Sequence, residues 1–127
     1  MAMTNKRKHE RIPMVAVATV QYEDMDKRRS VQAMISSISL GGVGLYADHS
    51  IEDDNDVSVT IRFIATEGIM KTITIEGQVV YNRKIGDMNF MGIQFDDEIS
   101  DRNHPSLHEY IERALKYSRF PLRKRPY

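Results

Sequence analysis

The chain contains no cysteine, and that absence removes several classes of function at once. A protein without cysteine has no disulfide framework, no thiolate zinc site and no cysteine nucleophile. Its apolar runs are also far shorter than the roughly 18 to 20 residues that a membrane-spanning helix requires. The first residues are polar and basic with no apolar segment behind them, unlike a secretory signal. We therefore expect a cytoplasmic protein without membrane insertion.

The chain also lacks net charge, because 18 Lys and Arg residues balance 18 Asp and Glu residues. Such a molecule has no overall field that would draw it to nucleic acid or to an anionic membrane. The charges are unevenly placed, however, with basic residues at both ends and acidic residues in segments 52–56 and 96–101. We expect no specific nucleic-acid partner, while weak and salt-dependent polyanion binding by the two basic ends stays open.

A length of 127 residues and an apolar content of 41% suit one domain with one modest core. Stretches rich in Val, Ile and Thr, broken by Gly or by charged turns, predict six strands. These strands cover residues 14–22, 30–39, 43–47, 57–64, 72–83 and 89–95, with segment 23–29 as a charged turn. Short turns between so many strands favour a mainly β fold, a closed or nearly closed six-stranded antiparallel β-barrel without a free edge.

One α-helix is predicted near the C-terminus. Pro105 precedes Ser106, and Ser106 has capping-box spacing to Glu109. Apolar residues then recur on one face of the helix, at Leu107, Tyr110, Ile111, Ala114 and Leu115. We expect this face to cap or flank the barrel. The chain is thus divided into a flexible basic arm (residues 1–11), the barrel with its helix (12–118) and a basic tail (119–127).

Two motifs suggest ligand binding. Arg7 and Arg11 form an RxxxR pair on the arm, and Ser37, Ser39 and Gly42 follow where the second predicted strand ends. Guanidinium groups hydrogen-bond phosphate or guanine bidentately and stack on aromatic rings. A glycine lets the backbone approach a ligand, and a neighbouring hydroxyl adds a donor. Together these groups suit a doubly phosphorylated ligand that carries purines.

This ordered pair resembles the PilZ domain, a bacterial receptor module for the second messenger cyclic di-GMP. The family pattern is RxxxR, then D/N-x-S-x-x-G at the end of the second strand of a barrel with a terminal helix. The resemblance extends from Lys6 to Tyr117. It implies cyclic di-GMP contacts by the motif residues, with two further candidates in the arm: Arg7, Arg11, Ser37, Ser39 and Gly42, then Lys6 and His9.

Ser37 departs from the pattern, because it stands where the family has Asp or Asn. The longer side chain reaches a guanine edge in the family, and losing a hydrogen bond to a charged acceptor costs about 1.5–3 kcal/mol, or about 10- to 100-fold in affinity. Weakened binding is therefore expected, unless a water bridges the gap. Lys6 stands where some members carry an arginine that accompanies a stacked ligand dimer. Lysine supplies charge without a planar stacking surface, so the number of ligands per subunit, one or two, stays open.

No set of residues predicts catalysis. The chain has no Walker loop, no HExxH segment and no arrangement typical of a Ser-His-Asp triad. His104 and His108 have a spacing that metal sites use, but no third ligand stands near them. Segment 52–56 lacks the glycine and the terminal glutamate of an EF-hand loop. We predict that the protein is not an enzyme and that it has no metal site and no cofactor beyond its ligand.

The function predicted from the resemblance is that of a receptor. Cyclic di-GMP would recruit Arg7 and Arg11, the arm would order over one barrel face, and an unidentified partner protein would read the change. The alternative is a PilZ-fold adaptor that acts through protein contacts and has weak or lost cyclic di-GMP binding, with Ser37 as the trace of that loss.

Overall fold

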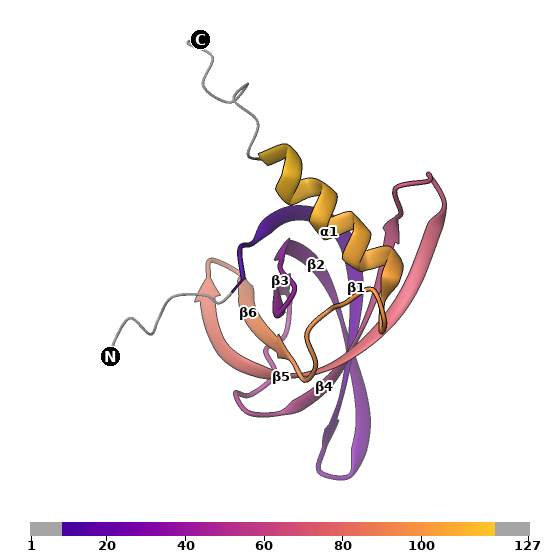
Figure 1. Ribbon diagram of the computed structural model, residues 1–127. Helices are drawn as coiled ribbons and strands as arrows, with labels where there is room; N and C mark the ends of the chain where they lie inside the picture. Colours follow the sequence, from indigo (N-terminus) through magenta and orange to yellow (C-terminus); the bar gives the residue numbers. More distant parts are fainter. Residues whose placement is uncertain (1–8, 119–127) are drawn as a thin grey trace, which may run out of the picture.

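The computed structural model describes residues 9–118, which form six antiparallel strands and one helix. The elements are β1 (Ile12–Asp24), β2 (Lys27–Ile38), β3 (Gly42–Ala47), β4 (Asp56–Ile64), β5 (Met70–Ile85), β6 (Met88–Phe95) and α1 (Pro105–Ser118). The strands pair in the order β1-β2-β3-β6-β5-β4, and β4 pairs with β1, so the sheet closes into a barrel (Figure 1). The prediction of a mainly β, six-stranded antiparallel barrel with a C-terminal helix is confirmed.

The barrel is built from two three-stranded meanders. Consecutive strands pair within β1-β2-β3 and within β4-β5-β6. Two further ladders, β1 with β4 and β3 with β6, join the meanders on both sides. Strands that are distant in sequence therefore become neighbours at these two seams.

The first hairpin is longer than the sequence indicates. Segment 23–29 was predicted as a charged turn, but the ladder between β1 and β2 continues to the pair Asp24 and Lys27. Only Met25 and Asp26 remain in the turn, and their φ angles are 52° and 69°. Two consecutive positive φ angles are typical of a type I′ turn, whose twist matches that of a two-stranded ribbon. This ribbon projects beyond the barrel wall (Figure 1).

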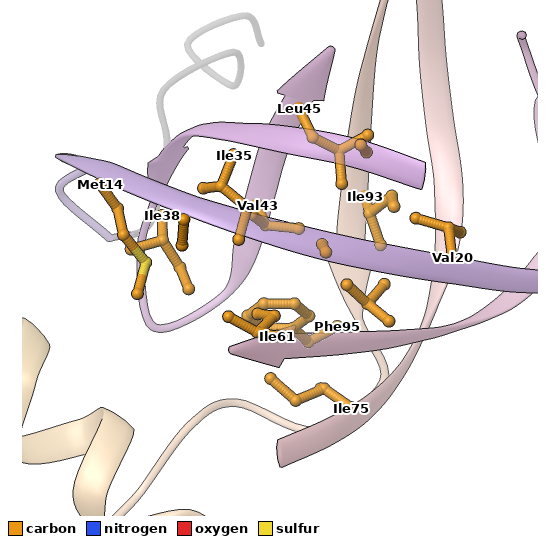
Figure 2. Packing of buried hydrophobic residues seen from close by; sticks show 14 of the residues in the cluster. Met14, Val20, Ile35, Ile38, Val43, Leu45, Ile61, Ile75, Ile93 and Phe95 are labelled. Carbon is orange, nitrogen blue, oxygen red and sulfur yellow. The ribbon is translucent and has the colours of Figure 1, made fainter. Parts of the chain in front are cut away.

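Alternating apolar side chains fill the barrel interior. Along β1 every second residue from Ile12 to Val20 is buried, as expected for a strand with one face in a core. Figure 2 shows core side chains from several strands directed toward one another, among them Val43, Ile61 and Phe95. The core therefore holds the walls of the barrel in a fixed arrangement, and the outer surface is left for binding.

Helix α1 lies across one end of the barrel, as predicted (Figure 1). Leu107 and Ile111 are fully buried. The ring of Tyr110 meets that of Phe63 edge to face, with the centroids 5.6 Å apart. Burial of this apolar face stabilises the helix more than its intrinsic propensity does.

The start of α1 corrects one prediction. The helix begins at Pro105, a position where the missing N–H of proline costs no hydrogen bond. The backbone N–H of His108 donates to the carbonyl of His104 at 2.9 Å, which places His104 just ahead of the first turn. Ser106 lies inside the helix, so the predicted capping box that begins at Ser106 is wrong. Within residues 9–118 no helix is long and apolar enough to cross a membrane.

Candidate ligand-binding site

Arg11 and Ser37 are in direct contact, although 26 residues separate them in sequence. The Arg11 Nη1 donates a hydrogen bond to the Ser37 Oγ at 3.1 Å. Ser37 lies on β2 opposite Pro13 of β1 and opposite Gly44 of β3, and both motif residues are half-buried. The second arginine of RxxxR is thus held against the first position of the second motif.

Both ladders around Ser37 are irregular. The pairing of β1 with β2 shifts between Pro13 and Ala16, and that of β2 with β3 shifts between Ile35 and Ser37. Extra residues of this kind bend a strand and re-aim its side chains. Accordingly Ser36 and Ser37 are both half-buried, where regular alternation would bury one of them and expose the other. The irregularity makes the Ser37 hydroxyl available to Arg11.

Ser39 shapes the turn between β2 and β3. Among residues 9–118, Ser39 is the one polar residue that is buried, with 5% of its surface exposed. Its N–H donates to the carbonyl of Gly42 at 2.9 Å, and its Oγ accepts the N–H of Gly41 at 3.1 Å. In this conformation the hydroxyl is occupied by backbone groups of the turn. Ser39 therefore stabilises the turn, and this structural role is separate from the ligand contact that the motif predicts.

Gly42 lies where the backbone of β6 comes close. A Cβ at this position would be 2.5 Å from the carbonyl oxygen of Ile93, too close for any side chain. The N–H of Phe95 donates to the carbonyl of Gly41 at 2.9 Å, which fastens the same turn to the end of β6. The glycine is thus required by packing, and that requirement is independent of a ligand.

His9 contacts this turn from the arm. Its Cδ2 lies 3.1 Å from the place where a Cβ on Gly41 would be, and its Nε2 lies 2.9 Å from the Glu98 Oε2. A carboxylate at this distance would compete with any anionic ligand for the same ring nitrogen. Glu98 was missed as a site residue, because its position in the acidic segment 96–101 was the only sequence signal. The proposed ligand contact of His9 stays a prediction.

Arg7 and Lys6 lie outside the described residues, so their ligand contacts stay predictions. The described residues bring together a guanidinium and a hydroxyl in Arg11 and Ser37, beside a turn shaped by Ser39 and Gly42. Such an arrangement can bind an anion by charge-assisted hydrogen bonds and leaves room for a backbone to approach it.

His104 lies just ahead of α1, and His108 lies in its first turn. Burial lowers the pKa of His104 below its ordinary value. His108 lies 3.8 Å from the carboxylate of Glu112, one turn further along the helix. Over residues 9–118 no three His, Asp or Glu side chains are grouped so that they could hold a metal ion.

Comparison with known proteins supports the family resemblance. A family model described as PilZ domain matches residues 5–113. No curated protein matches the sequence. One similar solved structure is that of the inhibitor of motility of Bacillus subtilis (MotI/DgrA), with a TM-score of 0.72 and 19% identity over 91% of this chain and 54% of that chain. Another is the PilZ domain of YcgR from Escherichia coli with c-di-GMP, with a TM-score of 0.63 and 15% identity over 90% and 95% of the two chains.

At these identities the two structures show a shared fold and no more. The chain spans about half the length of the Bacillus subtilis protein.

Proposed function

The chain belongs to the PilZ domain family, and we propose that it is a receptor module for cyclic di-GMP. The observation that carries this proposal is the 3.1 Å hydrogen bond between Arg11 and Ser37. It joins the two motifs that the family uses for the nucleotide. It also places a guanidinium, the side chain best suited to phosphate and guanine, on the outer surface of a rigid barrel.

The contact between Arg11 and Ser37 suggests how the ligand enters. The Arg11 donor is charged, whereas the Ser37 hydroxyl that accepts from it is neutral. A phosphate adds the opposite charge and can accept two parallel N–H bonds from one guanidinium. A ligand phosphate can therefore replace Ser37 as the acceptor of the Arg11 N–H. In the proposed mechanism the contact with Ser37 keeps the arginine ordered before the ligand arrives, which lowers the entropy cost of binding.

The response of the protein follows from the arm. In the proposed mechanism Arg7 joins Arg11 on the ligand, and residues 1–11 then cover part of the barrel surface. That step changes the surface that a partner protein can bind. The signal is passed on without a chemical reaction.

A second candidate function is a protein-interaction adaptor with weak or lost ligand binding. Two observations favour it. Ser37 stands at the Asp/Asn position of the family pattern, and the Ser39 hydroxyl is already satisfied by the backbone of its own turn. The receptor and the adaptor differ in one measurable property, which is affinity for cyclic di-GMP.

Titration calorimetry with cyclic di-GMP tests the receptor function. We expect saturable binding by the wild-type chain and about 10- to 100-fold weaker binding by Arg11→Ala, since a hydrogen bond to a charged group contributes about 1.5–3 kcal/mol. Arg11→Lys keeps the charge but loses the planar fork, so it should recover little of the affinity. Arg62→Ala on β4 removes an exposed arginine away from the motifs and serves as the matched control.

Two results separate the candidates. Absence of heat for the wild-type chain at high micromolar concentration would overturn the receptor and support the adaptor. Equal weakening by Arg11→Ala and Arg62→Ala would show that binding follows net charge and not the motif.

A further inference from the structure

Three aromatic side chains gather on the outer surface of the barrel near Ser37. Tyr46 lies on β3, Phe90 on β6 and Tyr81 on β5. The ring centroid of Phe90 is 4.9 Å from that of Tyr46 and 5.9 Å from that of Tyr81. We call Tyr46, Phe90 and Tyr81 the aromatic shelf.

The aromatic shelf is outside the core. Leu45 and Met91, the chain neighbours of Tyr46 and Phe90, are fully buried in the barrel, so the aromatic side chains point the other way. Tyr81 keeps 38% of its surface exposed. Tyr46 and Phe90 are half-buried, so each of the three rings keeps part of its surface on the outside of the barrel.

Glycines bring the aromatic shelf close to the sheet. Four residues form one row across the barrel wall, with Ser37 opposite Gly44, Gly44 opposite Gly92, and Gly92 opposite Tyr81. A Cβ on Gly44 would lie 2.8 Å from the Phe90 Cζ, and a Cβ on Gly92 would overlap the ring of Tyr81. The aromatic rings occupy the space above the two glycines.

The aromatic shelf adjoins the contact between Arg11 and Ser37. The Ser37 Oγ accepts a hydrogen bond from Arg11, and the same atom is 3.4 Å from the place of a Cβ on Gly44, which Phe90 covers. A cationic donor and an aromatic ring thus both lie near one hydroxyl. This juxtaposition suits a ligand that carries a phosphate and a planar base.

We propose that the aromatic shelf stacks a guanine base of cyclic di-GMP while Arg11 holds the adjacent phosphate. This inference rests on the receptor function proposed above. Stacking uses the face of the base and needs no partner at its hydrogen-bonding edge. The aromatic shelf therefore compensates for Ser37, which is too short to supply the edge contact of the family pattern.

Variants of Tyr81 test the proposal by calorimetry with cyclic di-GMP. Tyr81→Leu removes the ring and should weaken binding about 5- to 150-fold, the range found when an aromatic platform loses a stacked base. Tyr81→Phe keeps the ring and is the matched control, with affinity within about twofold of wild type. Phe90→Leu should behave like Tyr81→Leu.

A thermal unfolding curve for each variant reports on the fold. Phe90 covers Gly44, so Phe90→Leu could lower stability as well as affinity. Tyr81 is more exposed, so the affinity of Tyr81→Leu decides whether the rings stack a base. Proton NMR of the wild-type chain gives a second measurement that needs no substitution. Stacking should move the ring resonances of Tyr81 or Phe90 upfield when cyclic di-GMP is added.

The outcomes distinguish base stacking by the aromatic shelf from the receptor function on which it rests. Equal affinity of Tyr81→Leu and wild type, together with weak binding by Arg11→Ala, overturns the aromatic shelf and leaves the receptor function in place. Unmoved ring resonances at saturation overturn it as well. Absence of binding by the wild-type chain overturns both, while loss of affinity in Tyr81→Leu but not in Tyr81→Phe supports both.

Discussion

Replacing Ser37 with aspartate should strengthen cyclic di-GMP binding, because it restores the carboxylate of the family pattern. In the ligand-free protein the new carboxylate would accept from Arg11, as the serine hydroxyl does now at 3.1 Å. In the complex it would accept from a guanine edge while Arg11 turns to the phosphate. The change in affinity is the difference between these two gains.

The magnitude follows from the two contacts. A hydrogen bond to a charged acceptor contributes about 1.5–3 kcal/mol. The Arg11 pair is half-buried, and ion pairs near the surface contribute about 0.2–1 kcal/mol, so about 0.5 kcal/mol is subtracted for the stabilised ligand-free state. The net gain of about 1–2.5 kcal/mol corresponds to binding that is about 5- to 70-fold tighter. Ser37→Asn supplies the reach without the charge and should tighten binding by about 2- to 12-fold.

Calorimetry at fixed pH and salt measures the three dissociation constants. Ser30→Asp on the exposed part of β2 makes the same chemical change away from the motifs and controls for net charge. A double-mutant cycle of Ser37→Asp with Arg11→Ala isolates the coupling between the two side chains. Dissociation constants of wild type and Ser37→Asp that agree within twofold would show that the missing carboxylate does not limit the affinity.

Three further predictions concern stability. Gly42→Ala should lower the free energy of unfolding by about 1–3 kcal/mol in urea denaturation, because the new Cβ meets the Ile93 carbonyl; a neutral result would contradict the close approach. Ile111→Ala should cost about 2–5 kcal/mol by leaving a cavity under α1, while Glu109→Ala on the exposed face of the helix should stay within about 0.5 kcal/mol. Burial lowers the pKa of His104, so the unfolded chain takes up a proton at higher pH than the folded chain does. Stability should therefore fall as the pH drops through the ordinary histidine value of 6.5, and His104→Gln should flatten that fall. An unchanged pH dependence in the variant would contradict this assignment.

The strands were predictable where one face enters the core. Val57 to Ile64 alternates in the sequence, and β4 spans Asp56–Ile64. The ribbon formed by the ends of β1 and β2 was not predictable. Its charged residues lie beyond the core and show no alternation of apolar side chains. Its length depends on cross-strand pairs and on a type I′ turn formed without glycine at Met25 and Asp26.

The candidate site was predictable only where a motif marks it. The family resemblance assigned Arg11 and Ser37 to one ligand site, and the two side chains are in contact. Glu98 and Phe90 carry no such mark. Their places near the site depend on the pairing of β3 with β6, which brings together segments that are distant in sequence.

The row of residues from Ser37 to Tyr81 crosses from one meander to the other, so ligand binding at this row is linked to folding of the whole barrel. Ser37 and Gly44 belong to the first meander, whereas Gly92 and Tyr81 belong to the second. Contacts between distant segments are slow to form, so this row is complete only after the seam between β3 and β6 has closed. A ligand that spans the row binds the finished barrel and neither half, and it shifts the folding equilibrium by an amount that grows with its concentration. If the chain is the cyclic di-GMP receptor proposed above, the concentration of the ligand would set how often the chain opens to proteases.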